Sequence, residues 1–344
     1  MNGRTKQTIL FSPLGWGLGH ASRIIPLIHK ELQNENKVLV AGDESSLSLI
    51  KSTFPKIETF LFKSIKIKFR KGKSQLLPLA WFALRLPFVR IWEHRKLQQI
   101  IKESHVNMVI SDNRYGLYSK HAFCVIITHQ LRLIPPKPFG FAQKLTELLL
   151  KNWLKKFDEV WIPDYPNEKS IAGKLSGSNG LLNLKYIGIL SRFTLILLTA
   201  EETNWELIGI VSGPEPQRTI FEKKITQLAQ KLKVKSLILE GLPTQGDKIV
   251  QVSENVWKSG HLSDANFYNV VKNAKYVISR SGYSTVMDLL AIEKSALLVP
   301  TPGQTEQEYL AKHLAEKGLF ESVPQEGLLN IEIKKLMSPV ALNL

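Results

Sequence analysis

The chain has 344 residues, and its 46 lysines and arginines against 30 aspartates and glutamates give a formal net charge of +16. Its content of 44% hydrophobic and 22% charged residues is that of a folded protein and excludes a wholly disordered chain. The single cysteine, Cys124, excludes a disulfide framework or a thiolate metal cluster within one chain and fits a reducing compartment. The length favours two domains over one.

The first half of the chain alternates short apolar runs with longer helical stretches. The expected strands are residues 8–12, 38–41, 58–62, 106–111, 124–128 and 160–162. The expected helices are residues 22–34, 45–54, 76–103 and 140–157. Such alternation predicts βα units and a parallel sheet.

A second series of the same kind follows a stretch rich in glycine, serine and asparagine. Its expected strands are residues 207–212, 236–240, 256–258, 276–279, 296–299 and 320–323, and its expected helices are 217–232, 264–273, 285–291 and 306–316. We therefore predict an α/β fold with two Rossmann-like domains, residues 1–168 and 191–344, joined by a linker at 169–190. Two such domains are expected to face each other across a ligand-binding cleft.

The positive charge is concentrated in two stretches. Residues 63–102 carry a net +10 and residues 129–156 a net +5, and both are rich in large apolar side chains. This mixture suits an anionic lipid surface. The candidate membrane-facing residues are Trp81, Phe82, Arg85, Phe88, Arg90 and Trp92. The alternative, core helices with solvated basic faces, stays open. No zinc-finger, RNP-like or helix-turn-helix pattern supports nucleic acid as a partner.

The N-terminus and the apolar segments predict a peripheral protein. A polar start leads directly into Ile9, so no secretory signal is expected. No uncharged apolar run reaches 18 residues, and residues 76–92 contain two arginines and two prolines. We expect a cytoplasmic location on the inner face of the cytoplasmic membrane.

The first candidate motif lies between the first strand and the following helix. It contains Gly15, Gly17, Gly19 and His20. Glycines allow close approach of the backbone to a ligand, and a helix start offers free N–H groups. A histidine there can act as a general base near neutral pH. An ordinary tight turn is the alternative.

The second half carries two further loops with small residues. Ser212 and Gly213 precede a helix whose first turn holds Arg218, an arrangement that can hold phosphate. A second loop contains Arg280, Ser281, Gly282 and Thr285, with Asp288 one turn later as a ribose-binding candidate. Glu306 and Gln307 start another helix. Together these loops suit a nucleotide sugar.

With these motifs, the chain resembles the GT-B glycosyltransferases of family 28. The resemblance covers most of the chain and is carried chiefly by SRSGYSTVMDLL (279–290) and PTPGQTEQEYLA (300–311). It implies two Rossmann-like domains, a UDP-sugar bound mainly by the second, and an acceptor bound mainly by the first. It also implies inverting transfer without a metal.

The resemblance also implies roles for single residues. Gly17, Gly19 and His20 match the family's glycine-rich loop and candidate base. The donor-side matches are Ser212, Gly213, Ser281, Gly282, Thr285 and Gln307. Leu262 matches a position whose backbone would recognise the nucleotide base of the donor. Asp288 stands where relatives have glutamate, and Glu306 stands where the best-known member of the family has a second glutamine, so the donor sugar is left open.

Polar residues also follow two strands of the first domain. Asp112, Asn113, Arg114, His129 and Gln130 are candidate acceptor contacts, with Asp112 and His129 as alternative bases. Local loop contacts are the competing interpretation.

The leading hypothesis is a glycosyltransferase that moves a hexose or N-acetylhexosamine from a UDP-sugar to a lipid-linked or membrane-associated acceptor in envelope glycan biosynthesis. No cofactor and no metal are expected, because the UDP-sugar is the donor substrate. The alternatives are a sugar-nucleotide epimerase or hydrolase of the same fold, and a non-catalytic protein that binds an anionic ligand.

Overall fold

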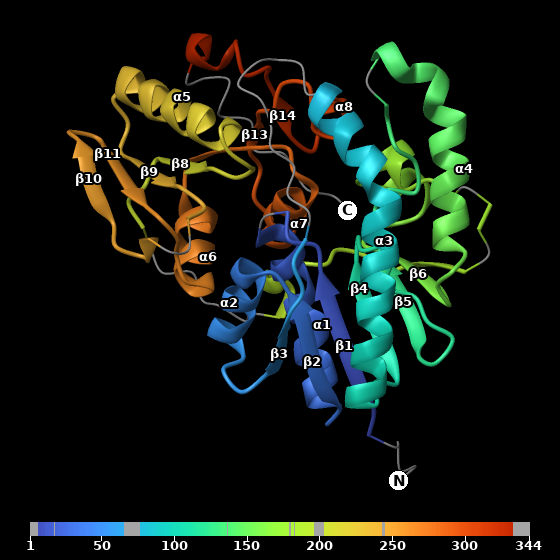
Figure 1. Cartoon of the computed structure of the whole chain (residues 1–344). Coiled ribbons are helices and arrows are strands. Elements are labelled where there is room, and N and C mark those ends of the chain that lie inside the picture. Colours follow the sequence, from blue (N-terminus) through green and yellow to red (C-terminus); the bar gives the residue numbers. More distant parts are fainter. Residues whose placement is uncertain are drawn as a thin grey trace. The chain divides into compact units, whose positions relative to one another are not determined.

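The protein folds into two units that divide between Ser191 and Arg192. The computed structural model describes residues 6–16, 18–64, 76–135, 137–178, 180–181, 183–195, 203–242 and 245–332. Figure 1 shows the helices and strands of the chain, coloured along the sequence from blue at the N-terminus to red at the C-terminus. Each unit contains one seven-stranded sheet with helices packed against it.

The first unit is a doubly wound sheet in which every strand pairing is parallel. Its strand order is β3-β2-β1-β4-β5-β6-β7. The strands are β1 (Thr8–Pro13), β2 (Lys37–Gly42), β3 (Glu58–Leu61), β4 (Met108–Asp112), β5 (Phe123–Ile127), β6 (Glu159–Ile162) and β7 (Leu184–Tyr186). The helices are α1 (Leu18–Gln33), α2 (Glu44–Thr53), α3 (Leu76–Ser104) and α4 (Gln143–Leu154).

Alternating side chains of the central strands build a core on each face of this sheet. Ile9 and Phe11 of β1 pack with apolar residues of α1 and α2. Leu10, between them, faces the other way and packs with apolar residues of α3 and α4. Because a strand buried on both faces needs apolar residues at every position, β1 reads as a continuous apolar run.

The second unit repeats this architecture with shorter strands. Its strand order is β10-β11-β9-β8-β12-β13-β14, and only the β10–β11 pairing is antiparallel. The strands are β8 (Leu207–Ile210), β9 (Ser236–Leu239), β10 (Val250–Ser253), β11 (Val256–Ser259), β12 (Tyr276–Ser279), β13 (Leu297–Leu298) and β14 (Glu321–Ser322). The helices are α5 (Gln217–Leu232), α6 (Asp264–Asn273), α7 (Tyr283–Ala291) and α8 (Thr305–Glu316).

Each sheet has one switch point, where the strand order reverses. In the first unit the chain runs outward from β1 through β2 to β3 and then returns to the other side of β1 with β4. In the second unit β8 and β12 have the same relation. Ligands of open α/β sheets bind outside the carboxyl ends of the strands at such points. The site is therefore expected at the ends of β1 and β4 and of β8 and β12.

The expected fold class is confirmed, but the expected linker is not a linker. Residues 169–190 contain β7, which pairs with β6 and extends the first sheet. Strands β7 and β10 are short and lack an apolar run, so the sequence did not predict them. In the described part of the chain, none of the helices combines the length and the apolarity needed to cross a bilayer.

Candidate active site

The switch point of the first unit holds a buried cluster of three charged or titratable side chains. His20 and Arg23 lie three residues apart on α1, so both face the end of β4. Asp112 is the last residue of β4 and is paired in register with Pro13 of β1. Arg23 donates to both carboxylate oxygens of Asp112, and His20 Nδ1 lies 3.0 Å from Asp112 Oδ1. Arg23 and Asp112 are almost fully buried, whereas 16% of the His20 side chain remains exposed.

The surroundings shift both titratable groups of this cluster. Burial lowers the pKa of His20 from its ordinary 6.5, and the charges of Arg23 and His129 lower it further, against the opposing effect of Asp112. Burial alone would raise the pKa of Asp112, but the charges and hydrogen bonds of Arg23 and His20 hold it at about 2. At neutral pH the cluster therefore contains an ionised carboxylate and a neutral imidazole.

His20 Nδ1 lies between a hydrogen-bond acceptor and a hydrogen-bond donor. The ionised carboxylate of Asp112, 3.0 Å away, only accepts, and Arg23 Nη2, 3.1 Å away, only donates. In the tautomer with the proton on Nδ1, which bonds to Asp112, the lone pair lies on Nε2, which bonds to none of the described residues. A histidine oriented in this way can accept a proton from a hydroxyl group.

The glycine-rich loop is shorter than expected. Gly19 and His20 lie in the first turn of α1, which begins at Leu18, and Gly17 lies outside the described residues. Gly15 N donates to Ser64 Oγ at 3.0 Å. A Cβ atom on Gly15 would lie 1.2 Å from Asp43 Oδ2, so this position has no room for a side chain.

Arg114 supports this loop and is not an acceptor contact as expected. It is 1% exposed, and it donates to Glu93 Oε1, to the carbonyls of Pro13 and Phe62, and to Ser64 Oγ. Burial raises the pKa of Glu93, and the Arg114 charge opposes this rise. The ion pair therefore ties α3, the end of β1 and the segment after β3 to the end of β4.

The other acceptor-side candidates lie near the same strand ends. Asn113 follows Asp112 with φ 54°, and its backbone N–H donates to Ile127 O. His129 is buried, and its electrostatic interaction with His20 lowers the pKa of His20. Gln130 is partly buried, and its backbone N–H donates to Thr128 Oγ1. Of the three, His129 thus has a direct electrostatic effect on the His20 cluster.

The switch point of the second unit is built from small residues. Ser212 and Gly213 follow β8, and Gly213 has φ 100° with no atom within 4 Å of the point that a Cβ atom would occupy. Ser281 and Gly282 follow β12, and Gly282 is the N-cap of α7 without a side-chain hydrogen bond. The first N–H groups of α7 are therefore not capped by the N-cap side chain, and such a helix start can bind an anion.

The remaining donor-side candidates hold or flank this switch point. Ser281 Oγ donates to Gln307 O at 2.8 Å, and Gln307 Oε1 accepts from Thr301 N at 2.9 Å. Among the described residues, none accepts a hydrogen bond from the side-chain amide nitrogen of Gln307. Thr285, Asp288 and Glu306 are partly buried on α7 and α8, and Leu262 is buried after β11.

Two arginines expected to contact the donor are instead internal. Arg218 is 9% exposed and pairs with Glu215 and Glu222 around the start of α5. Arg280 is fully buried and donates to Gln217 O, Val299 O, Pro300 O and Gln325 Oε1. Both guanidinium groups thus form their hydrogen bonds and ion pairs within the protein.

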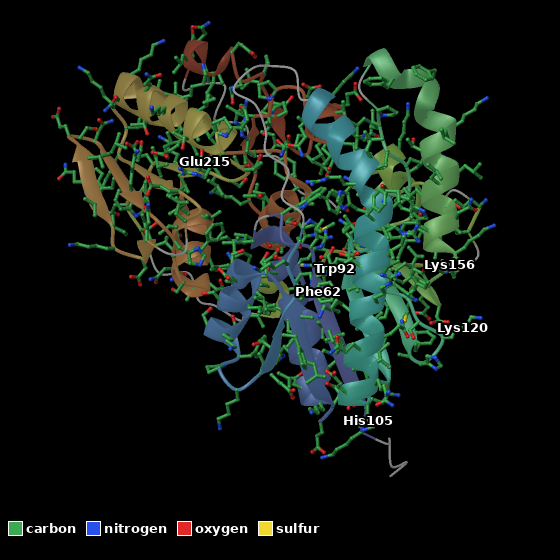
Figure 2. All side chains as sticks on the ribbon, viewed as in Figure 1. Phe62, Trp92, His105, Lys120, Lys156 and Glu215 are labelled. Carbon is green, nitrogen blue, oxygen red and sulfur yellow. The ribbon has the colours of Figure 1, made fainter. Side chains whose placement is uncertain are left out.

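The candidate membrane-facing residues divide into exposed and internal ones. Phe88 is 74% exposed and Trp92 41%, although the Trp92 ring also packs 5.1 Å from Phe62 (Figure 2). Arg85 is exposed as well, whereas Arg90 donates to Tyr115 O and lies 4.4 Å over the Trp153 ring. Trp81 and Phe82 fall in α3, but their side chains lie outside the described residues.

Two residues of the first switch point, Arg23 and Asp43, were not predicted from the sequence. The spacing of Arg23 three residues after His20 on one helix was an available signal. Asp43, directly after β2, becomes recognisable only when the sheet order places β2 beside β1. Among the described residues, no group of three or more histidine, cysteine, aspartate or glutamate side chains could hold a metal ion.

Comparison with known proteins agrees with this architecture. Residues 224–342 match the model of the glycosyltransferase family 28 C-terminal domain. An uncharacterized glycosyltransferase of Methanosarcina acetivorans is 26% identical, over 92% of this chain and 86% of that protein. The UDP-N-acetylglucosamine--N-acetylmuramyl-(pentapeptide) pyrophosphoryl-undecaprenol N-acetylglucosamine transferase of Histophilus somni is 23% identical, over 75% of this chain and 70% of that protein.

A solved structure shows the same fold. The crystal structure of the glycotransferase of kitacinnamycin superimposes with a TM-score of 0.66 at 12% identity, over 98% of this chain and 90% of that chain. The chain is therefore a glycosyltransferase with the GT-B fold that carries a family 28 C-terminal domain.

Proposed function

We propose that this glycosyltransferase transfers a hexose or N-acetylhexosamine from a UDP-sugar to a lipid-linked or membrane-associated acceptor, with inversion and without a metal. The observation that carries the proposal is the contact of His20 with buried, ionised Asp112 at the first switch point. The similarity to a transferase named for a UDP-sugar donor and an undecaprenol-linked acceptor supports the substrate classes.

In this proposal His20 is the catalytic base. The acceptor hydroxyl gives its proton to His20 Nε2 while its oxygen attacks the anomeric carbon on the face opposite the diphosphate. The bond from that carbon to the diphosphate oxygen breaks, and its electron pair leaves with UDP. Asp112 stays ionised and stabilises the imidazolium through the Nδ1–H bond.

Asp112 and His129 are no longer the best candidates for the base. Both oxygens of Asp112 accept from Arg23 in a fully buried site, and its pKa of about 2 makes it a poor proton acceptor at neutral pH. His129 is buried, whereas His20 is partly exposed. Asp112 is therefore a positioning residue for His20.

The second unit would hold the donor at its switch point. The uncapped start of α7 and the open backbone at Gly213 can place N–H groups against a diphosphate without clashing with it. The same groups would stabilise the negative charge that develops on the leaving UDP. Gln307, with free amide donors, would contact the donor sugar.

The first unit would also dock on an anionic membrane, which we place at the inner face of the cytoplasmic membrane. Exposed apolar side chains line α3 and α4; they are Leu84, Phe88, Ile91 and Trp92 on the first helix and Leu145, Leu148 and Leu149 on the second. Basic side chains accompany both helices; they include the exposed Arg85 within α3 and the exposed Lys156 just after α4, which Figure 2 labels. Apolar insertion combined with basic residues suits a peripheral membrane protein.

The test is UDP release in the presence of a lipid-linked acceptor sugar. We expect His20→Gln to lower the turnover by about 10²–10⁴-fold, the usual contribution of a general base. Thermal stabilisation by UDP should stay unchanged, because His20 lies in the other unit. His121→Gln, which changes an exposed histidine of the same unit, is the matched control and should behave like the wild type.

The alternatives give different results in the same assay. Release of UDP without any acceptor would indicate a hydrolase or an epimerase instead of a transferase. A protein that no UDP-sugar stabilises would exclude the proposed donor class. If the turnover of His20→Gln were within threefold of the wild type, His20 would not be the catalytic base.

A further inference from the structure

Arg280 is a buried cation without a carboxylate partner. Five arginines in the described part of the chain are no more than 9% exposed: Arg23, Arg114, Arg192, Arg218 and Arg280. The first four form ion pairs, with Asp112, Glu93, Asp264 and the pair Glu215 and Glu222, respectively. Arg280 forms none with any described residue.

The contacts of Arg280 are neutral. Its terminal nitrogens donate to three backbone carbonyls and one amide oxygen, at 2.6–3.2 Å. Its guanidinium carbon lies 4.0 Å from the centroid of the Phe221 ring, and its Nε has no hydrogen-bond partner. Carbonyl and ring contacts lower the cost of burying a cation, but they do not neutralise its charge.

The unpaired charge of Arg280 lies at the switch point of the second unit. Arg280 directly follows β12, the strand that forms one side of the second switch point. Its hydrogen bonds reach the start of α5 at Gln217 and the end of β13 at Val299 and Pro300. The loops that would surround a bound diphosphate thus share one buried guanidinium behind them.

The free protein bears a cost for this arrangement. Burial lowers the pKa of Arg280 to about 9, and no neighbouring carboxylate opposes the shift. The side chain is still a cation at neutral pH, so the local charge remains uncompensated. An anion bound nearby would remove much of the cost, because an opposite charge stabilises a buried cation.

We propose that the missing counter-charge of Arg280 is the diphosphate of the bound nucleotide, which the buried guanidinium attracts through space without touching it. Arg280 is then a positioning residue that discriminates a nucleoside diphosphate from an uncharged nucleoside. The inference rests on the proposed donor site in the second unit. It also explains why this unit can bind a dianion although the excess positive charge of the chain lies elsewhere.

The experiment separates charge from hydrogen bonding. Arg280→Lys keeps the charge with fewer directed donors, and Arg280→Gln keeps amide donors without the charge. Dissociation constants for UDP and uridine are measured by titration calorimetry on both variants and the wild type. We expect Arg280→Gln to bind UDP about tenfold or more weakly, Arg280→Lys to stay within about threefold, and uridine binding to change little in either.

Controls distinguish this role from a structural one. Lys231→Gln removes an exposed cation from the same unit and should leave the ratio of UDP to uridine affinity unchanged. Equal losses for UDP and uridine in both Arg280 variants would reduce Arg280 to a structural residue. A wild-type protein that binds no UDP would instead overturn the donor site itself, whereas UDP binding with an unaltered ratio in Arg280→Gln would overturn only the role of Arg280.

Discussion

The two switch points share one topology but handle charge in opposite ways. At the first, the buried arginines Arg23 and Arg114 each pair with a carboxylate, and the pKa of the partly exposed His20 is lowered. At the second, Arg280 has no such partner, and the loops around it offer backbone N–H groups. The buried arginine charges of the first switch point are compensated within the protein, whereas the charge of Arg280 at the second is not compensated by any described residue.

This difference fits the two halves of a transfer reaction. Proton abstraction from a hydroxyl needs a rigid base whose pKa is set in advance, and buried ion pairs provide that rigidity. Binding a diphosphate needs positive potential that is not already neutralised. Residues 63–102 and 129–156 carry a net +15, and their described basic side chains include exposed ones on or beside α3 and α4, such as Arg85 and Lys156.

The largest expected effect comes from removing the carboxylate of the first site. Asp112→Ala leaves Arg23 buried without a counter-charge, so the free energy of unfolding should fall by about 3–5 kcal/mol. Turnover should be lost, because His20 also loses the group that orients it. Urea unfolding and the UDP-release assay measure the two effects.

A surface pair provides the control for Asp112→Ala. Glu58 pairs with Lys37 in the same unit, but both side chains are more than half exposed. Glu58→Ala should change stability by less than about 1 kcal/mol, the usual range for an exposed pair. If Asp112→Ala lowered the free energy of unfolding by less than about 1 kcal/mol as well, the first site would not depend on its internal ion pairs. The proposed difference in charge between the two switch points would then be wrong.

Glycines of the two loops should respond to alanine for different reasons. Gly15→Ala forces the Asp43 carboxylate away from its bond to Ser64 N, with an expected cost of about 1–3 kcal/mol and a large loss of turnover. Gly213→Ala meets open space, and its cost of about 1–2 kcal/mol comes only from the left-handed backbone. Thermal unfolding and UDP binding compare the two.

A second substitution tests the steric explanation. Asp43→Ala should restore much of the stability lost in Gly15→Ala, since it removes the atom that the new Cβ meets. It should leave Gly213→Ala unaffected. Additive effects of Gly15→Ala and Asp43→Ala would show that the two residues do not share one space. Gly140→Ala, in open space, is the neutral reference.

Much of the fold followed from the sequence, because strands buried on both faces must be continuously apolar. Residues 8–12 and 276–279 were recognisable for that reason. Edge strands are not under this constraint. Strand β7 has only partly buried or exposed residues, so the region 169–190 read as a linker although it completes the first sheet.

The sequence predicted which residues lie near the switch points, but it did not predict which way their side chains point. His20 and Asp112 were selected separately as competing bases, whereas the structure places them in contact, with 3.0 Å between His20 Nδ1 and Asp112 Oδ1. Arg114 and Arg280 were expected to meet ligands because arginines after strands often do. A sequence does not reveal that both point inward, since that depends on which carbonyls and carboxylates other loops bring near them.

The exposed apolar stripe of α3 predicts a moderate effect on membrane binding. Phe88→Ser removes a side chain that is 74% exposed and touches little of the core, so folding should be unaffected. Flotation with vesicles of anionic phospholipid should weaken roughly tenfold, as expected when one aromatic anchor is lost. Phe123→Ser, at an exposed phenylalanine on β5, is the matched control, and equal losses for both would mean that α3 has no special role.

The smallest expected effect is a displacement of the acid limb of the pH profile. The base must be neutral, and the lowered pKa of His20 keeps it neutral down to some pH below 6.5, so kcat/KM should fall only below that value. His129→Gln removes an electrostatic interaction that lowers the pKa of His20, and the limb should therefore move to higher pH. Asp112→Asn removes a negative charge that raises it, so any residual activity should show a limb at lower pH. Because the two shifts have opposite signs, a general loss of structure cannot mimic them, and a limb that moves in neither variant would place the titrating base outside this cluster.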